Sequence, residues 1–433
     1  MTDWPKTVWT NWARQQFCAP SRIVRPQSEA ELADVVGEAA SRGEPVRAVG
    51  TGHSFTDCAC TDGVMIDMTG LQRVLDADRE SGLVTVEGGV TLRTLGPQLA
   101  RHGLGLQNQG DIDAQSITGA TATATHGTGA RFPNLSAQIV SLRLVTAAGD
   151  VLSLSAGSDD YLAARVSLGA LGVISAVTVQ TVPLYTLHRR DEKRSLSQTL
   201  DRLDEYVDGN DHFEFFVFPY AETALTRSTR RSDDRPSPTP AWRRRIADEW
   251  ENAGLGAICR AGRLFPRAAP ALNRLTTGLM SDSAVTDRAY RVYATERKVR
   301  FTEMEYAIPR EHARAAIRRV IDMTRRRGLP IMFPIEVRFA AGDDALLSTA
   351  QGRDTCYIAV HQYTGMEFES FFRAVESIMD DYDGRPHWGK RHYQVAATLA
   401  GRYPGWDRFA AVRNRLDPGR VFLNDYTRRV LGP

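Results

Sequence analysis

The chain has 433 residues, of which 42% are hydrophobic and 24% charged, an ordinary composition for a globular enzyme of two domains. Its 54 lysines and arginines nearly balance its 52 aspartates and glutamates, so the net charge of +2 gives no reason to expect a nucleic-acid partner. Five scattered cysteines match neither a secreted disulfide framework nor a zinc cluster, and we expect no metal site.

The N-terminal residues contain no recognisable targeting signal. The segment "MTDWPKTVWTNWARQQF" lacks a positively charged region followed by an apolar run. No stretch of the chain approaches the ~20 apolar residues that are needed to span a bilayer. We therefore expect a cytoplasmic protein, and peripheral contact with a membrane stays open.

Helical and extended patterns alternate in the first part of the chain. Ser28 is a candidate N-cap with Glu31 three residues later, and the apolar spacing that follows predicts a helix ending at Gly43. Residues 139–155 form two alternating runs joined by an Ala-Gly-Asp turn, which is typical of a β-hairpin. Further strands are predicted after Gly43 and at residues 64–69, 83–89 and 170–184, and a helix at residues 91–103. These elements predict an α+β domain over residues 1–185.

The second half of the chain is richer in strands. Extended patterns cover residues 212–220, 297–309, 329–341 and 354–364, and helical patterns cover residues 310–328 and 367–384. This order predicts a second domain over residues 186–384, a sheet with helices on one face. Residues 227–245 are rich in Arg, Pro and Ser. We expect a solvated loop or crossover there, with a docking patch for an acidic partner or a membrane surface as the alternative.

A glycine turn follows the first predicted helix and strand, in "RAVGTGHSF" (residues 47–55). Gly50 and Gly52 match the start of a dinucleotide-binding motif, but no third glycine stands at the required place and the following residues form a poor helix. A Rossmann fold is therefore excluded. The turn still offers backbone N–H groups that can close on a pyrophosphate, and Ser54 adds a hydroxyl.

A run of small residues, "QGDIDAQSITGATATATHGTG", covers residues 109–129. Gly, Ala, Ser and Thr fill a core poorly but let the backbone approach a flat ligand closely; close helix packing is the alternative explanation. Each of the two small-residue segments contains a histidine, His53 in the first and His126 in the second. Together they indicate one large ligand that carries phosphates and an aromatic ring system.

Three of these segments resemble a known family. "VGTGHSF", "GATATATHGTG" and "LGALGVISAVTV" are similar to the FAD-binding domain of the vanillyl-alcohol oxidase superfamily, and within it to the sugar-1,4-lactone oxidoreductases and alditol oxidases. The resemblance implies the two-domain α+β fold of that superfamily and FAD bonded covalently, through its C8α methyl group, to His53. The other implied cofactor-binding residues are Val49, Gly50, Thr51, Gly52 and Ser54 around the pyrophosphate, Ser116, Gly119, Thr123 and His126 along a second phosphate-side wall, Ile174 at the adenine end, and Gly110 and Asp111 near the flavin ring.

Charged residues stand at alternate positions in two apolar strands of the second half. In "PIEVRF", Glu336 and Arg338 project from one face of a strand, and His361 lies on the downstream strand "CYIAVHQYT". An isolated Glu-x-Arg pair is most often a solvent-exposed ion pair. The apolar residues on both sides indicate instead a buried sheet, in which charges need a partner or a purpose.

The segment "GRPHWGKRHY" contains His387 and Lys390, one of only four lysines in the chain. It resembles the His-Trp-x-Lys motif of the aldonolactone oxidoreductases. The resemblance implies that His387 lies beside the cofactor, and that Lys390 stabilises negative charge on the reduced flavin and helps to deprotonate the substrate hydroxyl. It also implies that Glu336, Arg338 and His361 line the substrate pocket, and that residues 385–433 return to the FAD-binding domain.

The function implied is FAD-dependent oxidation of an aldono-1,4-lactone of the L-gulono-1,4-lactone type at its C2 hydroxyl, which gives an ascorbate-type product. The electrons then pass to O₂ or to a protein or quinone acceptor. Gly110 has no side chain to shield the flavin ring, which favours O₂. The alternatives are an alditol oxidase that acts on linear polyols, and a non-catalytic flavin-binding protein that stores electrons.

Overall fold

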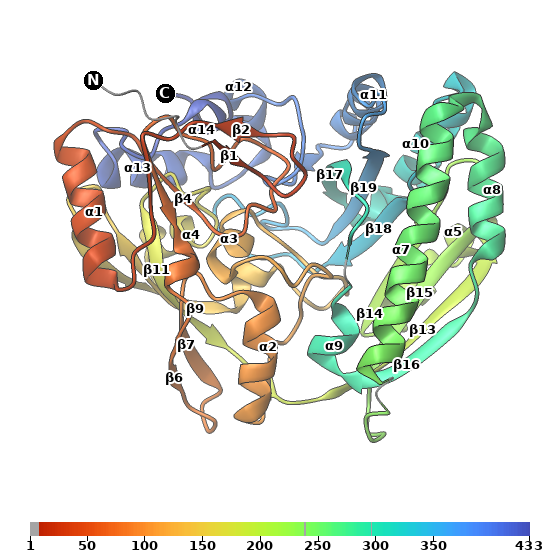
Figure 1. Ribbon diagram of the computed structural model, residues 1–433, viewed down its shortest axis with the longest axis horizontal. Helices are drawn as coiled ribbons and strands as arrows, with labels where there is room; N and C mark the ends of the chain where they lie inside the picture. The colour runs from red at the N-terminus through yellow and green to blue at the C-terminus, as the bar shows by residue number, and fades with distance from the viewer. Residues whose placement is uncertain (1–7, 238–239, 296) are drawn as a thin grey trace.

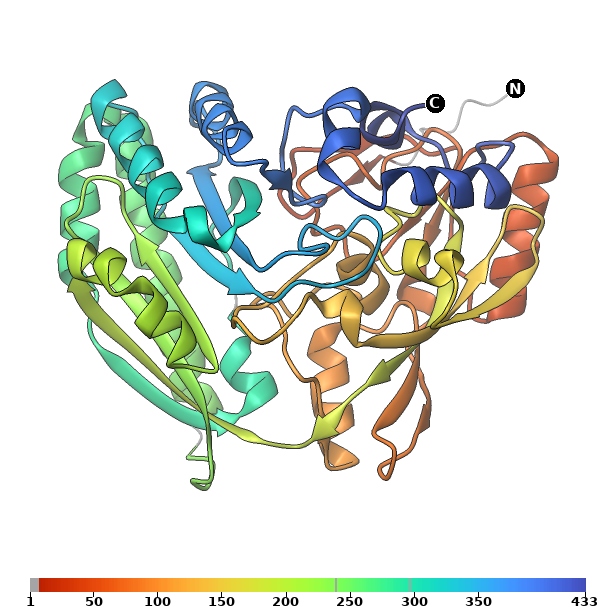
Figure 2. The same cartoon turned by 180° about the vertical axis from the view of Figure 1, so that it is seen from behind.

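A computed structural model describes residues 8–237, 240–295 and 297–433 of the chain. Two lobes lie side by side, each built around sheets, and the C-terminal helices lie across the top of the first lobe (Figures 1 and 2). The longest sheet is in the second lobe, which begins where β13 leaves the first lobe at Thr186. Among the described residues, no helix combines the length and the apolar character that crossing a membrane requires.

The first lobe contains a small parallel sheet and a larger antiparallel one. The parallel sheet has the order β3-β5-β4 and packs against α1, whose Leu32, Val36 and Ala39 are buried. The Ser28 hydroxyl accepts a hydrogen bond from the Glu31 amide at 3.2 Å, which confirms the predicted start of this helix. The bounds are β3 Arg22–Val24, α1 Glu29–Ser41, β4 Val46–Val49 and β5 Val64–Asp67.

The antiparallel sheet of the first lobe has the order β10-β9-β11-β7-β6. Its core packs against α2 and α4 and against residues from the C-terminal segment, including the fully buried Trp388 and Tyr426. The predicted hairpin is confirmed as β9 and β10, paired in register from Val145 opposite Val151. The bounds are β6 Val74–Ala77, β7 Leu83–Glu87, α2 Leu92–Arg101, α3 Ile117–Ala122, β9 Ile139–Val145, β10 Val151–Ser155, α4 Asp159–Ala164 and β11 Val173–Gln180. Two short pairs complete the lobe: β1 Trp9–Thr10 with β2 Phe17–Cys18, and β8 Leu104–Gly105 with β12 Val182–Pro183.

The second lobe, which we call the cap, is built on an eight-stranded antiparallel sheet of order β16-β13-β15-β14-β18-β19-β17-β20. One face is apolar and is covered by α5, α6, α10 and α11 (Figure 2). The strand bounds are β13 Thr186–Ser195, β14 His212–Val217, β15 Thr223–Ser232, β16 Ser283–Arg288, β17 Phe301–Pro309, β18 Ile335–Ala340, β19 Thr355–Tyr363 and β20 Arg385–Pro386. The helix bounds are α5 Leu196–Asp201, α6 Leu203–Asp208, α9 Ala289–Tyr293, α10 Ala313–Arg327 and α11 Glu369–Asp380.

Two sequence predictions for the cap were wrong. Helices α7 (Ala241–Leu264) and α8 (Ala269–Leu279) pack on the opposite face of the sheet from α10, against Phe301 and Phe333, so helices lie on both faces (Figure 1). Residues 227–232, expected in a loop, belong to β15, because this strand is paired along its length with β13 and β14. Residues 238–239 of the same segment lie outside the described residues.

The C-terminal segment joins both lobes. β20 pairs with β17 at the edge of the cap sheet, and Trp388 then enters the core of the first lobe, where its indole donates to the Leu347 carbonyl at 2.7 Å. The Phe55 amide donates to the Gly389 carbonyl at 2.7 Å, so this segment is bonded directly to the first glycine-rich loop. The remaining helices are α12 Ala396–Leu399, α13 Trp406–Leu416 and α14 Asp425–Leu431.

Candidate active site

A groove in the first lobe opens into a larger cavity between the lobes. The groove holds about 120 Å³ and the cavity about 450 Å³, and the two share His53, Ser54, Gln115 and Thr123 among their lining residues. They therefore form one continuous space. The predicted residues that line the narrow part are Val49, Gly50, Thr51, Gly52, Ser54, Ser116, Gly119, Thr123 and Ile174.

The glycines of the groove are required by its geometry. Gly52 has φ +68°, a conformation that other residues adopt only with strain. A Cβ added to Gly50 would lie 2.0 Å from Ser116 Oγ, and one added to Gly119 would lie 2.8 Å from the same atom. The two small-residue segments thus face each other with only backbone and hydroxyl groups between them. This is the lining that a long phosphate-bearing cofactor such as FAD needs.

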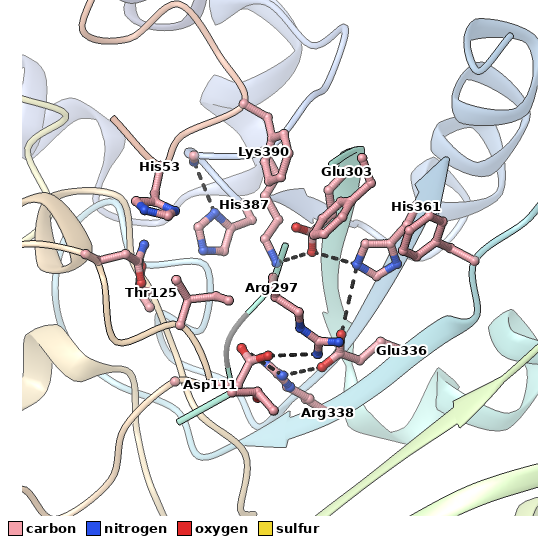
Figure 3. Close-up of a pocket in the computed structure, with 18 of the residues that line it drawn as sticks. His53, Asp111, Thr125, Arg297, Glu303, Glu336, Arg338, His361, His387 and Lys390 are labelled. Atoms are coloured by element: carbon pink, nitrogen blue, oxygen red, sulfur yellow. Dashed lines mark hydrogen bonds and ion pairs between the residues drawn. The ribbon is translucent and has the colours of Figure 1, made fainter. Parts of the chain in front are cut away.

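His53 lies where the groove meets the cavity (Figure 3). Its ring stacks on Trp12 with centroids 5.5 Å apart and an interplanar angle of 20°. Burial, helped by the nearby Arg93 guanidinium, lowers the pKa of His53 to about 4. The imidazole is therefore neutral at pH 7 and keeps a free lone pair.

The cap and the C-terminal segment contribute a cluster of charged side chains to the far wall of the cavity (Figure 3). Lys390 Nζ lies 2.6 Å from Glu303 Oε1 and 2.6 Å from Glu305 Oε2. Glu303 Oε1 is in turn 3.2 Å from His361 Nε2, across the directly paired strands β17 and β19. Burial opposes the charge of Lys390, but the two carboxylates hold its pKa above its usual value, so the side chain stays a cation.

Arg338 is the centre of a second group of charges. Its guanidinium contacts Glu336, and lies 2.8 Å from Glu214 Oε2 and 3.1 Å from Asp111 Oδ1. Asp111 also pairs with Arg297 at 3.1 Å. Three carboxylates therefore surround Arg338, and Glu214 is shared with Arg227, whose guanidinium lies 3.0 Å from its Oε1 atom.

Glu336 is the acid of this group whose protonation changes near neutral pH. Burial raises the pKa of Glu336 to about 7; Arg338 opposes the rise, and the neighbouring Asp111 and Glu214 carboxylates add to it. Its Oε1 atom is held by the Arg338 guanidinium. Its Oε2 atom lies 4.0 Å from His361 Nε2. Glu336 can thus take up or release a proton at the cavity wall.

The structure corrects the expected position of one cofactor-binding residue. His126 does not line the phosphate groove; it is buried on the cavity side, where Nε2 lies 3.2 Å from Glu305 Oε2 and the ring stacks on Tyr357. Its position differs because the second small-residue segment continues past the groove and passes under the cap sheet. Asp111 lines the same cavity as Gly110, where it forms the ion pairs with Arg338 and Arg297 described above.

Gly110 and His387 line the larger cavity. His387 is buried beside His126, and burial together with the Lys390 charge lowers the pKa of its imidazole to about 3. The ligand atoms of His126, Glu305 and His387 lie within 4.8 Å of one another, a spacing that can hold a metal ion. Lys390 already places its ammonium 2.6 Å from the Glu305 carboxylate and supplies the positive charge there.

Several residues of the site were missed from the sequence. Glu303 and Glu305 hold Lys390, while Glu214 and Arg297 complete the Arg338 group. The available signal was the Glu-x-Glu spacing in "FTEMEYAIP" and the single acid in "HFEFFVF", because acids inside apolar strands must be paired.

A groove lined by small residues and joined to a cavity with a charged wall fits a cofactor-dependent enzyme, and the matches to known families define its class as a two-domain flavoprotein oxidoreductase. Residues 20–155 match the FAD binding domain model, and residues 177–430 match the model of D-arabinono-1,4-lactone oxidase. The chain belongs to the D-arabinono-1,4-lactone oxidase family, within the vanillyl-alcohol oxidase type of flavoproteins.

Known proteins resemble the chain over nearly its full length. It is 76% identical to L-gulono-1,4-lactone dehydrogenase of Mycobacterium tuberculosis (strain ATCC 25618 / H37Rv), covering 98% of this chain and 99% of that protein. It is 34% identical to L-gulonolactone oxidase of Mus musculus, covering 97% of each. The crystal structure of cholesterol oxidase from B. sterolicum has the same fold, with a TM-score of 0.82 at 17% identity, over 100% of this chain and 99% of that one.

Proposed function

We propose that this protein oxidises an aldono-1,4-lactone of the L-gulono-1,4-lactone type at its C2 hydroxyl, giving an ascorbate-type product. The observation that carries the proposal is the single cavity in which the His53 end of the groove faces Glu336, Arg338, His361 and Lys390. Its volume of about 450 Å³ is in the range of small-molecule sites. The names of the relatives at 76% and 34% identity support the same substrate class.

FAD, when bound, supplies the acceptor for the hydride that leaves the C2 carbon. The side chains of the cap must then orient the lactone and remove the proton of its C2 hydroxyl. We propose Glu336 as the proton acceptor, because its pKa of about 7 lets it be ionised in the free enzyme and still hold a proton afterwards. Glu336 lines the cavity, and its Oε2 atom is the oxygen that Arg338 does not hold.

Lys390 and Arg338 act in this proposal as fixed positive charges. The carboxylates around them hold both pKa values above their usual ranges, so neither side chain gives up its proton in the free enzyme. A buried cation stabilises negative charge that develops on the substrate oxygen and on the reduced cofactor. This role for Lys390 replaces the expectation that it helps to deprotonate the substrate hydroxyl.

His53 is proposed as the covalent attachment point of FAD. Its imidazole is neutral at pH 7, because burial lowers its pKa to about 4, and the ring is held by stacking on Trp12 at the entrance to the cavity. A neutral nitrogen with a free lone pair is the nucleophile that such a bond requires. Precipitating the purified protein with acid tests the bond, since covalently held flavin colour stays in the pellet.

The electron acceptor is proposed to be O₂, with a protein or quinone acceptor as the alternative. Gly110 lines the cavity and offers no side chain to shield the cofactor ring. Stopped-flow mixing of the reduced enzyme with air-saturated buffer distinguishes these two electron acceptors. Rapid return of flavin absorbance supports O₂, and slow return that a quinone accelerates supports the alternative.

Turnover of a panel of substrates tests the proposed reaction. The panel contains L-gulono-1,4-lactone, a galactonolactone, xylitol and sorbitol, with a soluble dye as electron acceptor. Higher kcat/KM for the lactones supports the proposal, while a preference for the polyols shows an alditol oxidase. If the Lys390→Met variant retains its flavin but has lost the activity of the wild type, the alternative of a protein that only stores electrons is excluded.

A further inference from the structure

The helical pair α7–α8 presents an apolar surface on the outer side of the cap. We define the α7–α8 surface by Leu264 and Phe265 at the end of α7 and by Leu275 and Leu279 on α8. These side chains are 70%, 67%, 52% and 69% exposed, respectively. The two helices pack against each other at the margin of the second lobe (Figure 1). So much exposed apolar area on two neighbouring helices indicates an interaction surface.

Helix α8 buries polar residues beside Ala269 and Leu272, which pack into the cap. Asn273, Thr276 and Thr277 are buried against the cap, and Asn273 Nδ2 donates to the Ile331 carbonyl at 3.0 Å. The two leucines Leu275 and Leu279 point outward instead. A helix on a water-exposed surface normally buries its leucines and exposes its threonines. The two exposed leucines add to the apolar patch at the end of α7, and such a patch is stabilised by contact with an apolar phase.

The same surface is positively charged. Residues 252–281 contain four arginines and no aspartate or glutamate, whereas the acids of α7 precede this stretch. Arg260, Arg263, Arg267 and Arg274 are all exposed, and within the described part of the chain none of them forms an ion pair with a carboxylate. Exposed arginines beside exposed leucine and phenylalanine side chains are typical of helices that lie in the interface of an anionic bilayer.

We propose that the α7–α8 surface docks the protein on a membrane of anionic lipids. The leucine and phenylalanine side chains enter the headgroup region, and the arginines bind lipid phosphates. A second copy of the chain fits this surface less well, because a two-fold interface would bring the same arginines against each other with no acid to pair them. The proposal does not rest on the lactone chemistry.

The surface is also adjacent to the active site. Leu255 on α7 and Met280 directly after α8 line the cavity, so the two helices that would contact the bilayer form part of the cavity wall. Docking through α7–α8 would therefore hold the active site close to the lipid headgroups. None of the four residues that define the surface lines the cavity.

Sedimentation with lipid vesicles tests the proposal on the flavin-loaded, full-length protein. Wild-type protein is expected to pellet with vesicles of phosphatidylcholine and phosphatidylglycerol, to bind pure phosphatidylcholine at least tenfold more weakly, and to be released by salt. The double variant Leu275→Ser/Leu279→Ser should lose at least tenfold in affinity, and Arg267→Gln and Arg274→Gln about fivefold each. Leu75→Ser on β6, where the leucine is 41% exposed, is the matched control and should bind like wild type.

Two results would overturn the proposal. The first is wild-type protein that stays in the supernatant, or that pellets equally with neutral vesicles and regardless of the serine substitutions. The second is a dimer in light scattering that the double variant converts to a monomer, since a second copy would then cover the surface. Flavin absorbance and circular dichroism confirm that the double variant is folded, so these outcomes are independent of whether the protein turns over lactones.

Discussion

Glu336→Gln separates the catalytic role of this side chain from its effect on stability. Glu336 is only 7% exposed, and its pKa of about 7 means that roughly half of the molecules carry its proton at neutral pH. A base must be ionised to act, so wild-type kcat/KM should rise as the pH rises towards 7 and then level off. The variant should lose roughly 10²–10⁴-fold in kcat and also lose this inflection, while it retains its flavin.

The same substitution should stabilise the protein at alkaline pH. Because the folded-state pKa of about 7 is above the ordinary value of 4.5, the stability that the Glu336 proton contributes is complete below pH 4.5 and is lost as the pH rises through 7. That difference in pKa corresponds to about 3 kcal/mol of unfolding free energy. Glutamine resembles the protonated form at every pH. Urea unfolding should therefore show the variant about 3 kcal/mol more stable than wild type at pH 8.5, but only about 1 kcal/mol more stable at pH 5.

Glu303→Gln is the matched control, since it changes a neighbouring buried acid in the same way. Burial alone would raise the pKa of Glu303, but Lys390 and His361 lower it to about 2, so this carboxylate does not titrate near neutral pH. The Glu303 variant should keep the inflection near pH 7 and should be less stable than wild type at pH 8.5. The reasoning is refuted if Glu336→Gln keeps that inflection, or if it is no more stable than wild type at pH 8.5.

Three further substitutions address separate parts of the site. Lys390→Met should abolish lactone turnover and lower the unfolding free energy by about 3–5 kcal/mol, because it leaves two buried carboxylates without their cation; Lys390→Arg should recover most of the stability in the same urea assay. His53→Ala should move the flavin colour from the acid-precipitated pellet to the supernatant, whereas alanine at the exposed His102 should leave it in the pellet. Gly52→Ala should cost about 1–2 kcal/mol and lower the flavin content, because φ is +68° there. Gly254→Ala, inside α7 with open space around it, should leave the flavin content unchanged and raise the stability by about 0.5–1 kcal/mol.

The limits of sequence prediction are clearest in the cap. β18 and β19 were found because their apolar residues repeat along strands that are buried on both sides. β15 was missed because its arginine-rich end, residues 227–232, has the composition of a loop. Its first arginine is satisfied by acids on neighbouring strands: Arg227 pairs with Asp191 on β13 and with Glu214 on β14. Arg230 donates instead to Asn210 Oδ1 at 2.8 Å. Such a strand is stabilised by its neighbours, which no local pattern reveals.

The site shows the same limit. Glu336 and Arg338 were recognised because their spacing places both on one face of a strand. The importance of Glu303 depends on register, because pairing of β17 with β19 places it directly opposite His361. That register joins residues that are 58 positions apart in the numbering and cannot be read from either strand alone. The close approach of the ligand atoms of His126, Glu305 and His387 arises in the same way, because these residues come from segments that meet only in the folded chain.

The connection between Phe55 and Gly389 links the two halves of the site. The backbone hydrogen bond of 2.7 Å between them fixes the loop that carries His53 against the segment that carries Lys390. A Cβ on Gly389 would lie 3.2 Å from Ser54 Oγ, so the contact leaves little room for movement. The distance between the proposed flavin attachment point and the cation beside it is therefore set by backbone geometry, and not by the flexible lysine stem alone. The charges on β18 lack such a bond to the loop, so substitutions there should change catalysis without changing how the cofactor is held.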